Sequence, residues 1–279
     1  LLGAWAVLVG LGGARRVHRA TLTIPFSVLL TVAVVVAQAE DLRQASCDTM
    51  AMFKRVADKD LFVSEPPPQW FGNGANEEGD PSWSNANWLK SRFHLNFAEY
   101  HGGKNNFGVM RVMNDDLVQP HRGFGIHPHA NMEIVTYIVE GELTHKDSMG
   151  SGETLSRGAV QFMSAGSGVR HSEHNLGDKP LRFIQMWFHP AERGLEPNYG
   201  SFAGDAEARR DKLHHLVSDV RGDIKTPVQV HQDLNIWTCE LSKGESIDFK
   251  LNPVGHLEGN CETVACSRCL PLPLFCRST

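Results

Sequence analysis

Short apolar segments separated by turn residues are the feature that most limits how this chain of 279 residues can fold. Between residues 93 and 188 such segments recur at lengths of about four to eight residues, with Gly, Asn, Asp and Pro between them. They lie at residues 92–100, 107–115, 133–145, 159–165 and 181–190. The third is richest in β-branched residues, and no long stretch has the 3.6-residue period of an amphipathic helix. We therefore expect an all-β fold in which short strands close into a barrel or a sandwich.

The rest of the chain carries further structural signals. Residues 228–241 and 245–252 have the composition of strands and predict the opening of a second β unit, while residues 207–222 predict one or two turns of helix. Too few residues follow for a second barrel to close, because a barrel needs several more strands. Residues 65–88 are rich in Pro and Gly, which predicts an extended surface arm.

The N-terminal segment has the layout of a targeting sequence. A cluster of arginines precedes residues 20–39, which are uncharged and end in small residues before Glu40. This order is typical of a secretory signal peptide, and the length would also serve a membrane anchor. We expect residues 1–49 to be a signal-like segment, which implies a secretory or organellar protein. The alternative is an error in the gene boundary, with a cytoplasmic or nuclear protein starting at Met50 or Met52.

The C-terminal segment concentrates cysteine. Four of the six cysteines are crowded into this segment, at Cys261, Cys266, Cys269 and Cys276. Their spacing contains one CxxC and no histidine, and it is too short and irregular for a structural zinc site. We expect residues 261–279 to be an unstructured tail.

The charge balance excludes one broad class of partner. The net charge is −5, so the chain has no general electrostatic reason to bind nucleic acid or anionic lipid. We expect membrane contact only through residues 20–39, if that segment is not cleaved.

Two pairs of potential metal ligands, each spaced two residues apart, indicate a metal site. His127 and His129 form an HxH pair, and His171 and Glu173 form an HxE pair. On a strand, side chains two residues apart point to the same face, so each pair projects together. On facing strands the two pairs would bring three imidazoles and one carboxylate to one point inside a barrel, with one or two coordination positions open. That donor set suits a borderline divalent metal, iron before zinc, nickel or copper, and open positions imply chemistry at the metal.

Two neighbouring residues receive secondary roles. Glu133 lies four residues after His129 and is on the same face if the strand stays regular, so we expect it in the wall of the pocket. His174 is one residue out of register with the ligands, so we expect it to face outward. A single histidine is more often a surface or hydrogen-bonded residue than a ligand, and only the two alternations together favour a metal site. The apolar wall of the site is expected among Phe124, Met132, Phe162, Met163, Met186 and Trp187, for which ordinary barrel core is the alternative.

Three segments of the chain resemble the pirins, a bicupin family within the cupin superfamily. They are GFGIHPHANMEIVTYIVEGELTHKDSMG (residues 123–150), MSAGSGVRHSEHN (163–175) and QMWFHP (185–190). The resemblance implies two cupin β-barrels packed face to face. It also implies that His127, His129, His171 and Glu173 are the metal ligands. The implied metal is Fe(II), with Zn, Ni, Cu or Mn as alternatives.

The resemblance also suggests an activity. The family includes quercetin 2,3-dioxygenases, which open the flavonol ring with loss of carbon monoxide. The implied partners are a small aromatic, flavonol-like substrate and dioxygen, and Glu173 would be the catalytic base for the substrate hydroxyl. The alternative is a non-enzymatic, iron-responsive co-regulator, since animal pirins act in that way. We expect a monomer in either case.

The chain departs from the pirin pattern at both ends. Pirins are usually without a signal peptide and have a complete second barrel, whereas here the second barrel fades near residues 252–260. We therefore expect a metal-binding cupin domain at residues 50–200, an incomplete C-terminal cupin domain at residues 201–260, and the two terminal segments described above.

Overall fold

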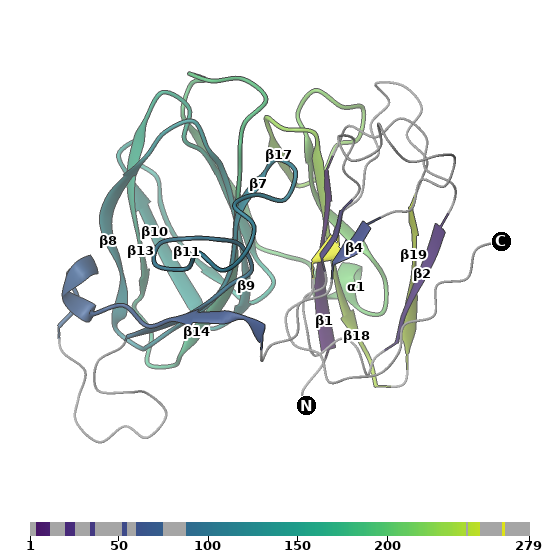
Figure 1. Cartoon of the computed structure of the whole chain (residues 1–279), viewed down its shortest axis with the longest axis horizontal. Coiled ribbons are helices and arrows are strands. Elements are labelled where there is room, and N and C mark those ends of the chain that lie inside the picture. Colours follow the sequence, from purple (N-terminus) through teal and green to yellow (C-terminus); the bar gives the residue numbers. More distant parts are fainter. Residues whose placement is uncertain are drawn as a thin grey trace. The chain divides into compact units, whose positions relative to one another are not determined.

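A computed structural model describes residues 60–74, 88–243 and 245–247 in full, and elsewhere describes only the backbone of short strands. It divides the chain into two compact units: Leu61–Gly204 forms one, and Leu1–Asp60 together with Asp205–Thr279 forms the other (Figure 1). The described part of the chain contains no helix that is long and apolar enough to cross a membrane.

The unit Leu61–Gly204 consists of two antiparallel sheets. The larger sheet has seven strands in the order β15-β12-β9-β14-β7-β6-β5. In chain order these strands are β5 (Phe62–Ser64), β6 (Leu89–Phe93), β7 (Met110–Val118), β9 (Glu133–Glu140), β12 (Val160–Ser164), β14 (Leu181–Phe188) and β15 (Asn198–Phe202). The smaller sheet has the order β11-β10-β13-β8. Its strands are β8 (Arg122–His129), β10 (Glu142–Asp147), β11 (Gly152–Ser156) and β13 (Val169–Asn175). The expected all-β fold is confirmed.

Apolar residues of both sheets meet in the core of this unit. Strand β9 is buried from Glu133 to Val139, which places it at the centre of the larger sheet between β12 and β14. One core cluster joins the fully buried Trp88, Ile138 and Phe183 with residues of the smaller sheet such as Leu143. Removing one of these large side chains would cost about 3–5 kcal/mol, because the void cannot fully collapse.

Two expected strands differ from the structure. The run at residues 92–100 is mostly loop: β6 ends at Phe93, and Ala98 has a positive φ of 45°. The run at residues 133–145 is a hairpin of two strands, β9 and β10, that turns at Gly141. Gly141 has φ 79°, and a Cβ there would lie 2.6 Å from the carbonyl oxygen of Pro180, so only glycine fits this turn.

The Pro- and Gly-rich segment is described as far as Gly74. It contains a short 3-10 helix, η4 (Pro68–Phe71), which contacts β8. Phe71 packs its ring on Trp88 and Phe124, at centroid distances of 5.6 and 5.3 Å. The segment is therefore attached to the core in this part, and is not only an extended arm.

The other unit contains the remaining strands. Its largest sheet has the order β17-β16-β18-β1-β20, and β19 pairs with β2 and β3 with β4. These strands are β1 (Ala4–Leu11), β2 (Ala20–Pro25), β3 (Val34–Val36), β4 (Met52–Lys54), β16 (His214–Asp219), β17 (Val228–Val230), β18 (Leu234–Leu241), β19 (Ser246–Leu251) and β20 (Val264–Ala265). The strand expected at residues 245–252 is confirmed as β19, whereas the run at residues 228–241 is divided into two strands, β17 and β18.

The helix expected at residues 207–222 is limited to one turn, α1 (Ala206–Arg209). Asp205 caps it by accepting hydrogen bonds from the backbone N–H groups of Glu207 and Ala208, each at 2.9 Å. Strand β16 follows after four residues, and its three central residues are buried.

Two interpretations of the chain ends stay predictions. The segment at residues 20–39 carries the strands β2 and β3, which does not test whether it is a targeting sequence. The four cysteines of the C-terminal tail lie outside the described residues.

Candidate metal centre

Three neighbouring strands of the smaller sheet each carry two polar side chains two residues apart. In the order β10, β13, β8 these pairs are His145 and Asp147, His171 and Glu173, and His127 and His129. The register places His145 opposite Glu173 and Asp147 opposite His171 on one side, and His171 opposite His127 on the other. Residues that face each other in neighbouring strands point to the same side of the sheet, so these side chains share one face. The pairs therefore come from adjacent strands, and the expected placement on facing strands is wrong.

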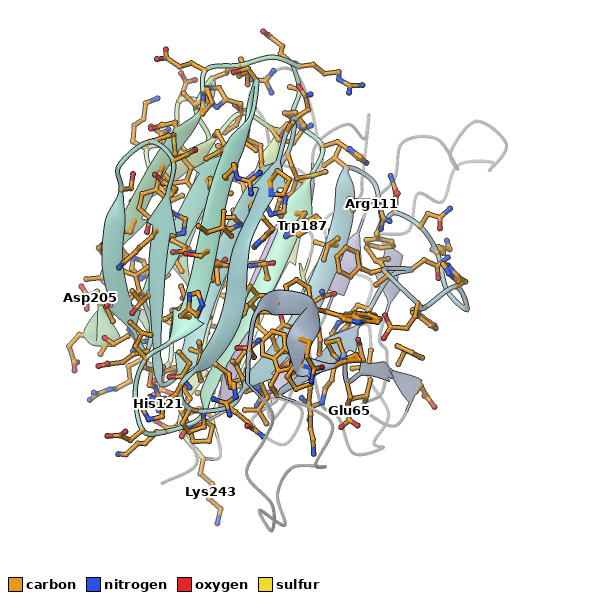
Figure 2. All side chains as sticks on the ribbon, turned by 90° about the vertical axis from the view of Figure 1, so that its left-hand side faces the viewer. Glu65, Arg111, His121, Trp187, Asp205 and Lys243 are labelled. Carbon is orange, nitrogen blue, oxygen red and sulfur yellow. The ribbon has the colours of Figure 1, made fainter. Side chains whose placement is uncertain are left out.

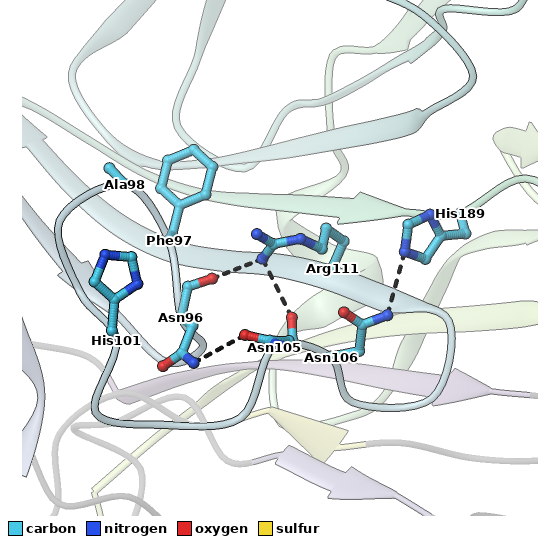
Figure 3. A pocket seen from close by; sticks show the side chains of 8 residues that line it. All are labelled: Asn96, Phe97, Ala98, His101, Asn105, Asn106, Arg111 and His189. Carbon is cyan, nitrogen blue, oxygen red and sulfur yellow. Dashed lines mark hydrogen bonds between the residues drawn. The ribbon is translucent and has the colours of Figure 1, made fainter.

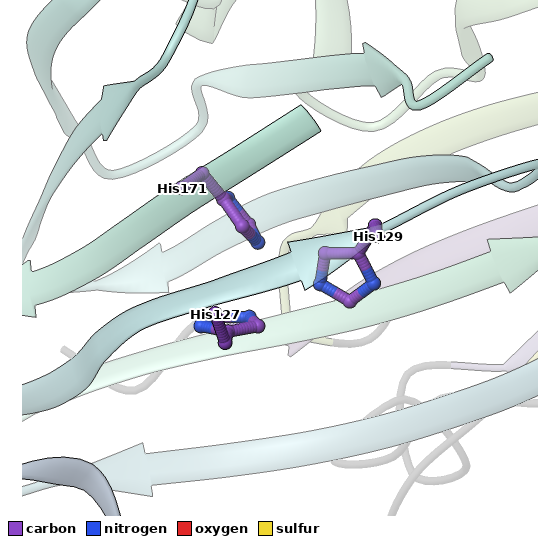
Figure 4. Close-up of side chains that lie close together, drawn as sticks. All are labelled: His127, His129 and His171. Carbon is purple, nitrogen blue, oxygen red and sulfur yellow. The ribbon is translucent and has the colours of Figure 1, made fainter. Parts of the chain in front are cut away.

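Three imidazoles converge at the open end of this cluster. The nearest ring nitrogens of His127, His129 and His171 all lie within 4.8 Å of one another (Figure 4). Their ring centroids are 4.5 to 4.9 Å apart. His171 is only 2% exposed, whereas His127 and His129 are partly accessible. The three rings thus form a pocket with a buried floor and an accessible mouth.

Burial keeps two of these imidazoles, those of His129 and His171, neutral in the metal-free protein. Burial, and then the neighbouring His171 and His127, lower the pKa of His129 to about 3. Burial, followed by His127 and His145, likewise lowers the pKa of His171 to about 3. Neutral imidazole is the form that binds a metal, so no proton has to leave these two rings at pH 7.

The hydrogen bonds of the cluster also fit a metal ion. Nδ1 of His127 donates to the carbonyl oxygen of Gly125 at 2.8 Å, which leaves the lone pair on Nε2. Both ring nitrogens of His171 are buried and have no hydrogen-bond partner. A buried polar nitrogen without a partner is costly, and a cation would satisfy it. The residues present therefore fit a borderline divalent metal.

Glu173 lies beside this group and not within it. At the same 4.8 Å limit its carboxylate groups with His145 and His171. Glu173 lies opposite His145 in the regular pairing of β10 with β13. The pairing of β13 with β8 is irregular: His171 pairs with His127, but Glu173 pairs with Phe124, so β8 has one extra residue between Phe124 and the HxH pair.

Two glutamines of the larger sheet hold the Glu173 carboxylate. Gln161 on β12 donates from Nε2 to Oε1 of Glu173 at 2.7 Å, and Gln185 on β14 donates to Oε2 at 2.8 Å. Trp187 donates from its indole N–H to Oε1 of Gln185 at 3.0 Å. The hydroxyl of Tyr199 lies 3.1 Å from Oε1 of Gln161. These contacts orient both amides with their NH₂ groups toward the carboxylate.

His145 and Asp147 were not among the predicted site residues. Nε2 of His145 lies 3.0 Å from Oδ2 of Asp147, and both side chains are inaccessible to solvent. The ring of His145 stacks on Tyr199 with centroids 4.3 Å apart and planes 13° apart. The HxD spacing of His145 and Asp147 is the same two-residue alternation that identified the other pairs. This spacing could have predicted the pair if the run at residues 133–145 had been divided into two strands.

Glu133 and His174, the two residues expected near the ligands, both lie outside the histidine cluster. Glu133 is not on the strand of His129, because the chain turns at Asn131 (φ 51°) and Glu133 begins β9. It is buried and accepts a hydrogen bond from the hydroxyl of Ser164 at 2.8 Å. His174 is half-buried, and its outward orientation stays a prediction. Burial and the nearby Lys146 lower its pKa.

Of the residues expected in the apolar wall, Trp187 lies at the histidines. Its ring is edge-on to His129, with centroids 4.8 Å apart, and it lies with Arg111 toward one end of the unit (Figure 2). Phe124 packs with Trp88 and Phe183 instead, and Met186 is fully buried.

A cavity of about 470 Å³ lies near Trp187. Its lining residues are Asn96, Phe97, Ala98, His101, Asn105, Asn106, Arg111 and His189 (Figure 3). Arg111 donates from Nη1 to the carbonyl oxygens of Asn96 and Asn105, at 2.6 and 3.2 Å. The ring of Phe97 is 5.3 Å from that of Trp187, so two aromatic contacts connect the cavity with His129.

A β fold of two antiparallel sheets with convergent histidines on adjacent strands is that of a cupin-type protein. The family model described as Pirin matches residues 78–188. A protein of Escherichia coli K12 named quercetin 2,3-dioxygenase is 40% identical over 174 residues, which cover 61% of this chain and 71% of that protein. A pirin-like protein of Caulobacter vibrioides is 38% identical over 165 residues, with coverage of 59% and 71%. The chain belongs to the pirin family.

A solved structure agrees with this assignment. The E. coli bacterial pirin YhhW, crystallised in complex with nickel(II), matches with a TM-score of 0.50 and 25% sequence identity. The match covers 74% of this chain and 99% of that one. The expected cupin fold is confirmed.

Proposed function

We propose that this protein is an Fe(II)-dependent dioxygenase of the quercetin 2,3-dioxygenase type. The observation that carries the proposal is the convergence of His127, His129 and His171, with a buried floor and an accessible mouth. The name of the E. coli relative supports the substrate class, a small flavonol-like aromatic, together with dioxygen.

The ion would be held by the three imidazoles, with Glu173 as a fourth ligand. When bound, it supplies a positive charge that lowers the pKa of a coordinated hydroxyl, and open positions where substrate and dioxygen meet. Three neutral nitrogens and a carboxylate also suit Zn, Ni, Cu or Mn. The nickel complex of the E. coli pirin supports testing these ions beside iron.

The residues around the histidines would pack against the substrate, accept its proton and exclude water. Trp187 presents its ring at His129, where a planar aromatic substrate would pack against it. Glu173 is the proton acceptor for the substrate hydroxyl, and Gln161 and Gln185 fix the direction of its oxygens. The buried face of the barrel excludes water from the side of His171.

Oxygen consumption tests the proposal directly. The full chain is loaded anaerobically with Fe(II) and mixed with quercetin, and dioxygen uptake and carbon monoxide release are measured. We expect both in the wild type, a loss of at least about a hundredfold in His127→Ala, and no loss in the control variant His101→Ala, whose residue is exposed. A metal-loaded wild type that consumes no dioxygen would overturn the enzyme assignment and favour a metal-dependent binding protein.

A further inference from the structure

His145 has a free nitrogen in the interior of the barrel. Its side chain is fully buried, and its Nε2 is engaged by Asp147 at 3.0 Å. Since an ionised carboxylate only accepts hydrogen bonds, Nε2 carries a proton and donates it to Asp147, and the tautomer that can bind a metal has its second nitrogen unprotonated. Nδ1 then carries a lone pair, and it has no hydrogen-bond partner. The carboxylate–histidine arrangement is the one that orients a metal-binding imidazole.

The ring of His145 is held firmly in this orientation. It stacks on Tyr199, whose hydroxyl donates to Glu153 at 2.5 Å. Asp147 in turn accepts hydrogen bonds from the backbone N–H groups of Met149 and Ser151. Reorienting the ring to find another partner for Nδ1 would break these contacts.

Ligand atoms of His171 and Glu173 lie close to the ring of His145. The nearest ligand atoms of His145, His171 and Glu173 are all within 4.8 Å of one another. All three residues are at most 3% exposed, and His171 offers two nitrogens without a hydrogen-bond partner. Each oxygen of Glu173 accepts one hydrogen bond from a glutamine, which leaves a second lone pair on each.

We propose that the pocket holds one divalent cation in either of two positions that share His171 and Glu173. The outer position is completed by His127 and His129, and the inner position by His145, so that His145 is a metal-binding residue. Two cations so close together would repel each other and compete for His171, which limits the pocket to one ion. The two-histidine, one-carboxylate set of the inner position suits a first-row ion with open coordination positions, such as Fe(II) or Co(II).

A structural role for His145 alone predicts a different result. If the ring served only to pack on Tyr199, a ring without nitrogens would replace it without any effect on metal binding. If it binds the cation, its nitrogen is needed whenever the outer position is disabled.

Cobalt(II) binding to the full chain distinguishes these cases. Ligand-field absorption and metal content are measured for the wild type, for His127→Ala/His129→Ala, and for that double variant with His145→Phe added. We expect one Co(II) per chain in the wild type, one Co(II) with a changed spectrum in the double variant, and an affinity at least about tenfold lower again in the triple variant. The matched control adds His101→Phe to the double variant and retains its Co(II).

Folding is checked on each metal-free variant by circular dichroism and thermal unfolding. If His145→Phe does not fold, His145→Gln keeps a donor for Asp147 while removing the imidazole nitrogens. A folded double variant that binds no Co(II) would overturn the proposal. So would a triple variant that binds Co(II) as tightly as the double variant.

The inference rests on the metal-binding role proposed above, and the two fail separately. A wild type that binds no metal contradicts the proposed function itself. A wild type that binds one ion, with variants that show no dependence on His145, contradicts only the inner position.

Discussion

Asp147 accepts a hydrogen bond from Nε2 of His145 at 3.0 Å, and neither side chain is accessible to solvent. Its other oxygen accepts from the backbone N–H groups of Met149 and Ser151, at 2.8 and 3.0 Å. Burial alone would raise the pKa of Asp147, but the hydrogen bonds from His145, Ser151 and Met149 together lower it below its usual value. One carboxylate therefore both orients an interior imidazole and holds the turn between β10 and β11.

Replacing Asp147 tests how much its carboxylate contributes to the free energy of unfolding. We expect Asp147→Ala to lower the free energy of unfolding by about 2–4 kcal/mol, because it removes the partner of a buried imidazole donor and of two backbone donors. Urea denaturation measures the change. Asp178→Ala is the control: Asp178 also bonds to a histidine, His121, but is 94% exposed, and its loss should not be measurable. Equal stabilities of the two variants would contradict this role of Asp147.

Gly123 allows the two ligand-bearing strands to approach each other. A Cβ at this position would lie 2.4 Å from the carbonyl oxygen of Glu173 and 2.5 Å from Cα of His174, both in the backbone of β13. We expect Gly123→Ala to push β8 away from β13, to destabilise the protein by about 3 kcal/mol, and to weaken Co(II) binding. Gly152→Ala is the control, since its Cβ would meet nothing closer than 3.8 Å. Thermal unfolding and Co(II) titration are measured for both variants. Equal stabilities and equal Co(II) affinities would show that β8 and β13 do not approach closely at Gly123.

Asp116 makes stability depend on pH. It is fully buried and accepts a hydrogen bond from the hydroxyl of Ser91. Burial raises its pKa from 3.8 to about 8, and the neighbouring Asp115 adds to the effect. Because the folded state favours the protonated form of this carboxyl, the contribution of Asp116 to stability is greatest below about pH 4 and is lost as the pH rises toward about 8, by at most about 1.4 kcal/mol per pH unit.

The variant Asp116→Asn should remove this dependence. The amide has the shape of the protonated carboxyl and cannot ionise, so we expect the variant to be more stable than the wild type near pH 8 and to lose that advantage near pH 5. Guanidinium denaturation across this range measures both proteins. Parallel pH profiles would show that Asp116 is ionised in the folded state.

His129 and His171 produce the opposite slope in acid. Their pKa values of about 3 lie below the ordinary 6.5. Between these pH values the two histidines are protonated in the unfolded chain but neutral in the folded state. In the chelator-treated protein we expect stability to fall as the pH drops from about 6.5 toward 3, by up to about 1.4 kcal/mol per unit and histidine. His171→Asn should reduce this slope by about one proton, and the exposed His101→Asn should not. An unchanged slope in His171→Asn would contradict the burial of this imidazole in its neutral form.

Much of the site could be predicted from local spacing. The two-residue alternations at His127 and at His171 place their side chains on one face wherever a strand forms, so three of the predicted ligands come together as expected. The strand composition likewise predicted the all-β class. Both predictions depend only on the geometry of a single strand.

What could not be predicted depends on how strands pair. The pairing of β10 with β13 places Glu173 opposite His145, and a bulge in β8 interrupts the register between Glu173 and the HxH pair; no local pattern marks either feature in the sequence. The turn at Gly141 divides an apparently continuous apolar run, and this hid the HxD pair of His145. These features depend on Pro180 and on neighbouring strands far away in the chain, which single-segment patterns do not contain.

The hydrogen bonds from Trp187 to Gln185 and from Gln185 to Glu173 connect an indole to a carboxylate on the opposite sheet. A cation that draws the carboxylate toward itself must pull on the Gln185 amide and thereby change the partner of the indole N–H. The fluorescence of Trp187 depends on that hydrogen bond and on the imidazole beside it. If an ion binds at this carboxylate, the fluorescence of Trp187 would therefore report its position.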